Sequence, residues 1–272
     1  MNPIQQINIT EFDLQKTERY ILSIDLKING LSFIVLNDDR IIKGEIYEWP
    51  LKNWSYATTN FKSIFTSNTF LKSVFQKTII SIKSKDCTLI PNKFYDASKN
   101  RLILETYLGE KNLITNSQAL KQVSAHLIYA VSSSLNLLLK TSFPKAEVFH
   151  KSALFIDNGL KSAGNSDSIS LSISTQYFEI IGIKSKKLIA HNHFQFQSID
   201  EFMFLLLSFI KQNGFKTENL DLKLSGKILM SSKIGKNLEQ FFPNIHQANN
   251  SNISEKEIAF AEIKSYTILA NN

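Results

Sequence analysis

Cysteine is almost absent from this chain of 272 residues, in which Cys87 is the single example. One thiol excludes an intramolecular disulfide and any metal site built from several cysteines. Because structural disulfides belong to oxidising compartments, this composition favours a cytoplasmic protein. Cys87 follows two lysines and an aspartate and has no histidine beside it, so a plain buried cysteine is a better interpretation than an activated thiol.

Long hydrophobic runs are missing as well. The most apolar stretch, 202–210, is about half as long as a membrane-spanning helix must be. We interpret it as a buried helix, and we expect neither a transmembrane segment nor a signal peptide. With 43% hydrophobic and 20% charged residues the chain can bury a core. Its length suits two domains of roughly 100–150 residues each.

Arginine is scarce although the net charge is +7, since the only arginines are Arg19, Arg40 and Arg101. Recognition of phosphates and bases favours the bidentate guanidinium fork, and the lysines here are scattered. The densest lysine group falls in an expected hairpin turn and consists of Lys184, Lys186 and Lys187. We therefore expect a solvated turn rather than a phosphate-binding patch, and no nucleic-acid partner.

Two stretches, 21–38 and 169–188, resemble each other, because each reads as a strand, a tight turn, a strand and another turn. Such an internal repeat indicates a duplicated domain. Alternating apolar residues predict strands over 19–27, 31–37, 41–49, 78–82, 126–131, 146–149, three across 169–196, 220–224 and 244–248. Helical spacing and capping serines predict helices over 54–75, 95–108, 132–140, 151–160, 198–213, 232–242 and 254–270.

We thus expect an N-terminal arm over 1–17, a first domain with connecting helices over 18–160 and a second domain over 161–272, whose last helix could pack back on the first. Three strands, a helix, a strand, a helix and a strand, given twice, is the plan of the actin-like ATPase superfamily of actin, heat-shock chaperones and sugar kinases. The resemblance implies an α/β fold of two duplicated ribonuclease H-like domains, each a mixed five-stranded sheet flanked by helices.

Particular residues carry this resemblance. Residues 24–31, in which Asp25 precedes Asn29 and Gly30, resemble the first phosphate loop of the superfamily. Residues 171–176 occupy the place of the second phosphate loop, and 224–227 resemble the glycine-rich turn that receives adenosine. The pattern is similar to that of pilus-assembly and secretion proteins of this fold, and to an uncharacterised family of small bacterial proteins.

The resemblance implies a nucleotide cleft between the two halves. Its ligands would be ATP and magnesium, and its residues would be Asp25, Lys27, Asn29, Gly30, Ser174, Thr175, Gly226 and Lys227. Phosphate loops use glycine because backbone amides must approach the anion without a Cβ in the way. In this chain, lysine replaces a glycine of the first loop, and serine, threonine and glutamine replace glycines of the second. Ser172 stands where the second loop normally has an acidic residue.

Carboxylates for magnesium are few, since only Asp25 and Glu179 fall near the expected cleft. Asp25 could instead accept hydrogen bonds from turn amides, and Lys27 has the alternative of an ordinary surface lysine. We therefore expect no catalytic residue and no resident cofactor. His191 and His193 lie two apart on an expected strand and could share a metal, but no third ligand is near in sequence. We favour an ordinary strand with outward polar residues, and no metal site.

Two functions remain. The favoured one is a non-catalytic module that holds a protein partner or forms a homodimer, for which Trp49, Trp54, Tyr56 and Phe61 offer aromatic contacts unless they belong to the core. The alternative is a nucleotide-binding switch or weak ATPase of the superfamily. A basic surface for RNA or DNA is a distant third.

Overall fold

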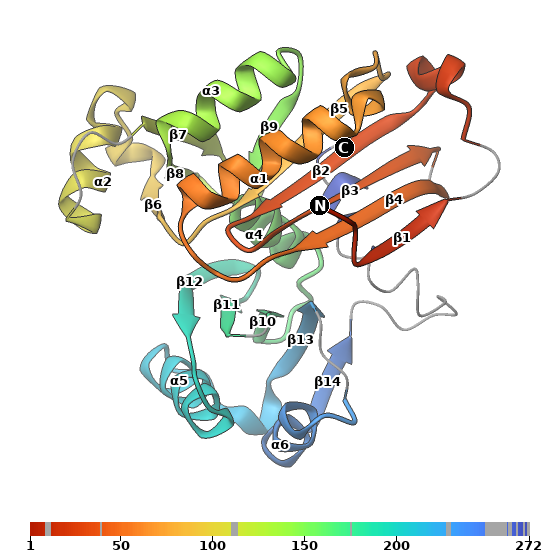
Figure 1. Cartoon of the computed structure of the whole chain (residues 1–272). Coiled ribbons are helices and arrows are strands. Elements are labelled where there is room, and N and C mark those ends of the chain that lie inside the picture. The colour runs from red at the N-terminus through yellow and green to blue at the C-terminus, as the bar shows by residue number, and fades with distance from the viewer. Residues whose placement is uncertain are drawn as a thin grey trace. The chain divides into compact units, whose positions relative to one another are not determined.

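The computed structural model describes residues 1–8, 12–38, 40–109, 114–174, 176–226 and 230–247, and near the C-terminus 260, 263–264, 266–268 and 270. The chain divides into two compact units (Figure 1). Unit 1 consists of Met1–Leu120, Ser124–Leu154 and Ile263–Asn272, and unit 2 consists of Lys121–Val123 and Phe155–Glu262. The α/β class and the duplicated actin-like plan expected from the sequence are confirmed by the sheets of these units.

Unit 1 is built on a six-stranded mixed sheet of order β1-β4-β3-β2-β5-β9. Its strands are β1 (Gln5–Asn8), β2 (Ile21–Lys27), β3 (Gly30–Asn37), β4 (Arg40–Glu48), β5 (Lys77–Lys83) and β9 (Glu147–His150). The first four form antiparallel pairs, and β2, β5 and β9 run parallel. The sixth strand is β1, which lies within the segment expected as a loose arm and pairs along β4.

Helices α1 (Trp54–Ser67) and α3 (Ser133–Ser142) lie side by side in unit 1 (Figure 1). Asn53 caps α1 by accepting a hydrogen bond from the amide of Tyr56. The sequence predicts this helix to continue to residue 75, but it ends before Asn68. The side-chain amide of Asn68 donates to the hydroxyl of Tyr47 at 2.9 Å, and the chain continues in a short 3₁₀ turn, Thr69–Lys72.

A second, three-stranded sheet in unit 1 was not predicted. It has the order β6-β8-β7, and its strands are β6 (Cys87–Pro91), β7 (Ile114–Ala119) and β8 (Ala125–Val131). Helix α2 (Asn100–Leu108) packs on it through Leu104, which contacts Ile128 and Ala130. Cys87 is buried, as expected.

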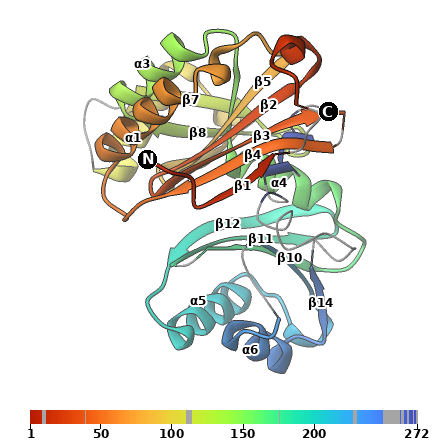
Figure 2. The same cartoon turned by 45° about the vertical axis from the view of Figure 1, so that its right-hand side comes forward.

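Unit 2 holds a five-stranded sheet of order β12-β11-β10-β13-β14. Its strands are β10 (Ser168–Ile173), β11 (Tyr177–Lys184), β12 (Lys187–Gln195), β13 (Asp221–Gly226) and β14 (Asn244–Gln247). Helices α5 (Ile199–Gln212) and α6 (Lys233–Phe241) cover one face of this sheet (Figure 2). Helix α4 (Lys151–Lys161) begins in unit 1 and passes into unit 2.

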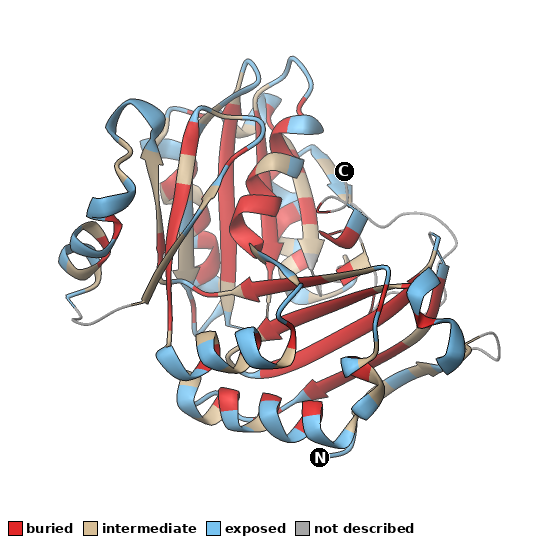
Figure 3. Cartoon of the chain, turned by 90° about the horizontal axis from the view of Figure 1, so that it is seen from above, coloured by how far each residue is buried: buried red, intermediate tan, exposed pale blue. Residues whose placement is uncertain are grey.

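The core of unit 2 lies between the sheet and these two helices. Strand alternation sends Leu171 and Phe178 toward α5, whose Phe202 and Leu206 are fully buried, as expected for the apolar stretch 202–210. Figure 3 shows the central strands of the molecule as buried bands. No helix among the described residues is long and apolar enough to cross a membrane.

The opposite face of the unit 2 sheet carries buried polar side chains beside buried isoleucines. Alternation places Ser170, Ser172 and Glu179 there, and all three are buried. Helix α4 approaches this face at Gly159, where a Cβ would lie 2.3 Å from Cδ1 of Ile181. A Cβ at this point of α4 would therefore require the buried side chain of Ile181 to shift.

Candidate functional site

Asp25 is the centre of a buried polar cluster in unit 1. Parallel pairing of β2 and β5 sets Asp25 opposite Ser81, whose hydroxyl donates to Oδ1 at 2.8 Å. The ammonium groups of Lys151 and Lys27 lie 3.0 and 3.2 Å from Oδ2. Asp25 is only 1% exposed, so these contacts replace the solvation that its carboxylate loses on folding.

Lys151 is the partner that sequence reasoning missed. It begins α4 directly after β9, and its side chain is 1% exposed. Its ammonium nitrogen also lies 4.8 Å from the ring centroid of Tyr266, a cation–π contact. Next to Tyr266, the hydroxyl of Thr267 donates to that of Ser23 at 2.7 Å. The C-terminal helical residues of unit 1 therefore pack on the same face of the sheet as Asp25.

Of the residues expected in the first phosphate loop, Asp25 and Lys27 are in direct contact, whereas Asn29 and Gly30 hold the hairpin together. The carbonyl of Asn29 accepts from the amide of Trp49 at 3.0 Å. A Cβ on Gly30 would lie 2.7 Å from the carbonyl oxygen of Tyr47, so glycine is required there for close approach of the strands.

The other expected cleft residues belong to unit 2. The amide of Ser174 donates to the carbonyl of Tyr177 at 2.8 Å and closes the turn between β10 and β11. Gly226 ends β13 opposite Ile173. Thr175 and Lys227 lie outside the described residues.

A magnesium ion does not fit the described residues around Asp25. Magnesium prefers carboxylate and water oxygens. A lysine ammonium already lies 3.0 Å from Oδ2, and a divalent cation at the same oxygen would meet strong like-charge repulsion. Lys27 also stands where a phosphate loop has glycine. The geometry of this cluster is that of an internally neutralised carboxylate.

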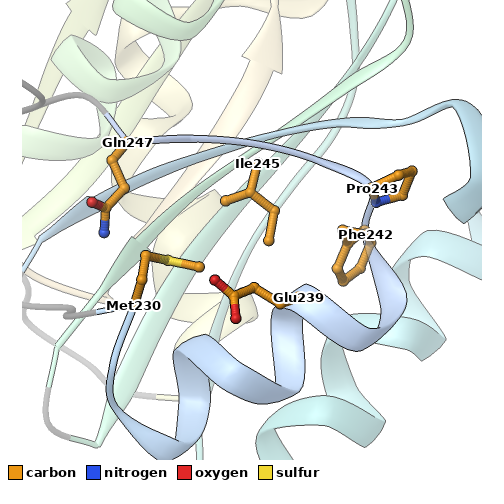
Figure 4. Close-up of a pocket in the computed structure, with 6 residues that line it drawn as sticks. All are labelled: Met230, Glu239, Phe242, Pro243, Ile245 and Gln247. Carbon is orange, nitrogen blue, oxygen red and sulfur yellow. The ribbon is translucent and has the colours of Figure 1, made fainter.

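A pocket of about 330 Å³ lies beside α6 and β14 in unit 2 (Figure 4). Its described lining residues are Met230, Glu239, Phe242, Pro243, Ile245 and Gln247. The carboxylate of Glu239 is the only charged group among them, and it would repel a phosphate. This pocket therefore suits an uncharged or cationic group better than a nucleotide.

Glu179, His191 and His193 gather on the face of the unit 2 sheet that is opposite α5 and α6. Glu179 faces His193 across the antiparallel pair β11–β12, and His191 is the diagonal neighbour. The Nε2 atoms of His191 and His193 lie 2.9 and 3.7 Å from Oε1 of Glu179. The side chain of His191 is only 6% exposed, so this outward polar residue of the expected strand is largely shielded from solvent. The sequence pattern showed no third ligand near the two histidines, but the observed strand register places Glu179 beside them.

The fold is shared with solved structures of low sequence identity. A protein from Bacteroides thetaiotaomicron, described as having an actin-like ATPase fold and unknown function, is 23% identical with a TM-score of 0.77, over 92% of this chain and 98% of that one. The PilM–PilN type IV pilus biogenesis complex contains a chain 10% identical with a TM-score of 0.54, over 92% and 97%. The ethanolamine utilization protein EutJ from Carboxydothermus hydrogenoformans is 8% identical with a TM-score of 0.51, over 91% and 89%.

These structures confirm the expected actin-like fold. No protein with a curated description matches the sequence. A family model matches residues 9–245, which is most of the chain. The chain therefore belongs to the family described as "Protein of unknown function (DUF3822)".

Proposed function

We propose that this protein is a non-catalytic binding module on an actin-like fold, which holds a protein partner and does not turn over nucleotide. The observation that supports this most is the pairing of Asp25 with the buried ammonium of Lys151. An actin-like ATPase needs a carboxylate that is open to magnesium, and here the chain supplies its own cation.

Two of the four aromatic residues first considered for a contact surface belong to the core, and Trp54 and Tyr56 are partly buried. Trp49 and Phe61 are buried and pack edge to face, with ring centroids 5.5 Å apart. Exposed apolar side chains occur instead around α2 on the three-stranded sheet, where Phe94, Leu102 and Tyr107 are 67%, 65% and 62% exposed. Large exposed apolar residues are typical of protein contacts, and we assign the partner surface to this subdomain.

The fold is compatible with such a role. The solved PilM–PilN structure is a protein–protein complex in which one chain has this fold. For the present protein we expect a complex, with a partner or with a second copy, whose affinity is the same with and without ATP.

Thermal unfolding with and without millimolar ATP, ADP and magnesium tests the nucleotide half of this proposal. A ligand at about 100 times its dissociation constant stabilises a protein by about 2.7 kcal/mol. We expect no shift of the melting temperature. A rise of several degrees that disappears in Asp25→Ala would establish the alternative, a nucleotide-dependent switch.

Surface substitutions test the binding half. The partner would be isolated from native extract, identified and reconstituted with the purified protein, and the complex would be measured by light scattering. Leu102→Glu and Tyr107→Glu should each weaken it at least tenfold, whereas Leu137→Glu, on the exposed face of α3, should leave it intact. Equal loss in all three variants, or a complex that forms only with ATP, would contradict the proposal.

A further inference from the structure

We propose that Glu179, His191 and His193 form a binding site for a divalent first-row transition-metal cation, with zinc as its occupant. This inference does not depend on the proposed function. The ligand atoms of all three side chains lie within 4.8 Å of one another. Two come from β12 and one from β11, which are joined by a two-residue turn, so the hairpin holds the three donors in place.

The spacing of the donors matches a metal ion. Zinc binds histidine nitrogen and carboxylate oxygen at about 2.0–2.2 Å, which places tetrahedral ligands about 3.4 Å from one another. The two imidazole nitrogens lie 2.9 and 3.7 Å from the Glu179 oxygen. Side-chain shifts of less than about 1 Å would therefore bring all three donors into coordination.

The chemistry of the donors selects the class of cation. Two imidazoles and one carboxylate suit zinc, iron, nickel or copper, whereas magnesium and calcium prefer oxygen alone. A site with three protein ligands leaves at least one coordination position to water or another molecule. The side chain of His193 is 21% exposed, whereas those of His191 and Glu179 are 6% and 1% exposed, so the open position lies on the His193 side.

The cation would also neutralise Glu179. Its carboxylate is buried, and a coordinated cation would offset part of the cost of burying its charge. A hydrogen bond donated by the His191 ring to Glu179 is the alternative, in which case the cluster is a hydrogen-bonded pair that binds no metal. The two arrangements differ in a measurable way, because only a metal site gives saturable binding that needs all three side chains.

Calorimetric titration of the full-length, tag-free protein with zinc chloride, after removal of metal by a chelator, tests this inference. We expect one zinc ion per chain with a dissociation constant of about 1 μM or lower. Each of Glu179→Gln, His191→Asn and His193→Asn should weaken binding at least tenfold. Cobalt titration should give the visible absorption bands of a low-symmetry site, and these bands should be lost in the same variants.

His246→Asn is the matched control. His246 lies on the same sheet and its Nε2 is 3.7 Å from a carboxylate oxygen of Asp221, but its side chain is 61% exposed and it has no second histidine beside it. Its zinc affinity should equal that of the wild type. Because Glu179→Gln could disturb the fold, the test also relies on His193→Asn, which changes a partly exposed side chain. Amide hydrogen exchange of β11–β12 provides a second measurement of zinc binding. Zinc should slow that exchange in the wild type and in His246→Asn, but not in His193→Asn. No saturable binding, or an equal loss in the control, would overturn the proposal.

Discussion

The meander β2–β3–β4 of unit 1 and the meander β10–β11–β12 of unit 2 have the same pattern of strand pairing. In each, a two-residue turn joins the second and third strands. The paired residues that flank this turn are Asn37 and Arg40 in unit 1, and Lys184 and Lys187 in unit 2. Each then shows one register shift at the same distance from the turn, following Val35 in β3 and Gly182 in β11. The duplication predicted from the sequence thus extends to an irregularity of the strand pairing.

The most deeply buried carboxylate of each meander, Asp25 or Glu179, lies on a different strand. The shared register makes Asp25 the counterpart of Ser172, and Ser32 the counterpart of Glu179. Both carboxylates therefore lie on the same face of equivalent sheets, one strand apart. Lysines of unit 1 surround Asp25, and histidines of unit 2 surround Glu179. The two units therefore share the sheet face on which a buried carboxylate lies. They differ in the strand that carries it and in the side chains that surround it.

The largest effect is expected from breaking the Asp25 cluster. Lys151→Met should lower the free energy of unfolding of unit 1 by about 3 kcal/mol, because it leaves a buried carboxylate with less compensation. The double variant Asp25→Asn with Lys151→Met should recover most of this loss. Both tryptophans, Trp49 and Trp54, lie in unit 1, so tryptophan fluorescence during urea denaturation reports on this unit.

Lys27→Met is the control for that experiment. The side chain of Lys27 is 30% exposed, so its contact with Asp25 is screened by water and its loss should cost less than about 1 kcal/mol. A Lys151→Met variant as stable as Lys27→Met would show that Lys151 is not the principal partner of the buried carboxylate.

Gly30 gives the next largest effect. Gly30→Ala should destabilise unit 1 by about 2 kcal/mol, because the new Cβ meets a backbone carbonyl that cannot move aside easily. The equivalent position in unit 2 is Tyr177, which pairs with Gln195 and is only partly buried. Tyr177→Ala should cost less than about 1 kcal/mol. The loss of stability in Gly30→Ala would be measured by chemical denaturation followed by fluorescence, and that in Tyr177→Ala by amide exchange. Equal losses in the two variants would contradict the expected role of the glycine.

Patterns that repeat along the chain predicted most of the fold. Strict alternation in β2 and β10, helical apolar spacing in α3, and the capping serine Ser198 of α5 located those elements within a few residues. The three-stranded sheet escaped prediction because β7 has the sequence ITNSQA, which alternates weakly and has no fully buried residue.

The candidate sites were harder to predict because they depend on distant residues. Asp25 was recognised, but Lys151 lies 126 positions away and nothing in the sequence near either residue pairs them. Glu179 and His193 are only one hairpin apart, but counting outward from the turn would have paired Glu179 with Asn192, because the register shifts by one residue after Gly182. An irregularity of the pairing, which the strand pattern does not reveal, therefore decides which side chains meet at this site.

Tyr129 tests the region of unit 1 that has no equivalent in the described part of unit 2. It lies on β8, and burial raises the pKa of its hydroxyl from 10.0 to about 12. The folded state then holds this proton more tightly than the unfolded state, so its stabilising contribution is complete below pH 10 and is lost as the pH rises toward 12. At pH 11 the wild type should have lost about 1.4 kcal/mol from this group, and Tyr129→Phe should not show that loss. Stability curves at pH 8 and pH 11 measure it, with the exposed Tyr107→Phe as control; the same alkaline loss in both variants would assign it to other groups.

The smallest effect concerns the turn between β11 and β12. Ser185 and Lys186 have φ of 47° and 61°, a left-handed conformation that glycine adopts without the steric cost of a Cβ. Two-residue hairpins with this backbone favour glycine at the second position, so Lys186→Gly should stabilise the hairpin by about 0.5–1 kcal/mol. Lys187→Gly, one residue later in the strand, should destabilise it instead, because glycine weakens a strand. Protection of the β11–β12 amides from exchange measures both changes, and a destabilising Lys186→Gly would mean that the contacts of the lysine stem outweigh the relief of backbone strain.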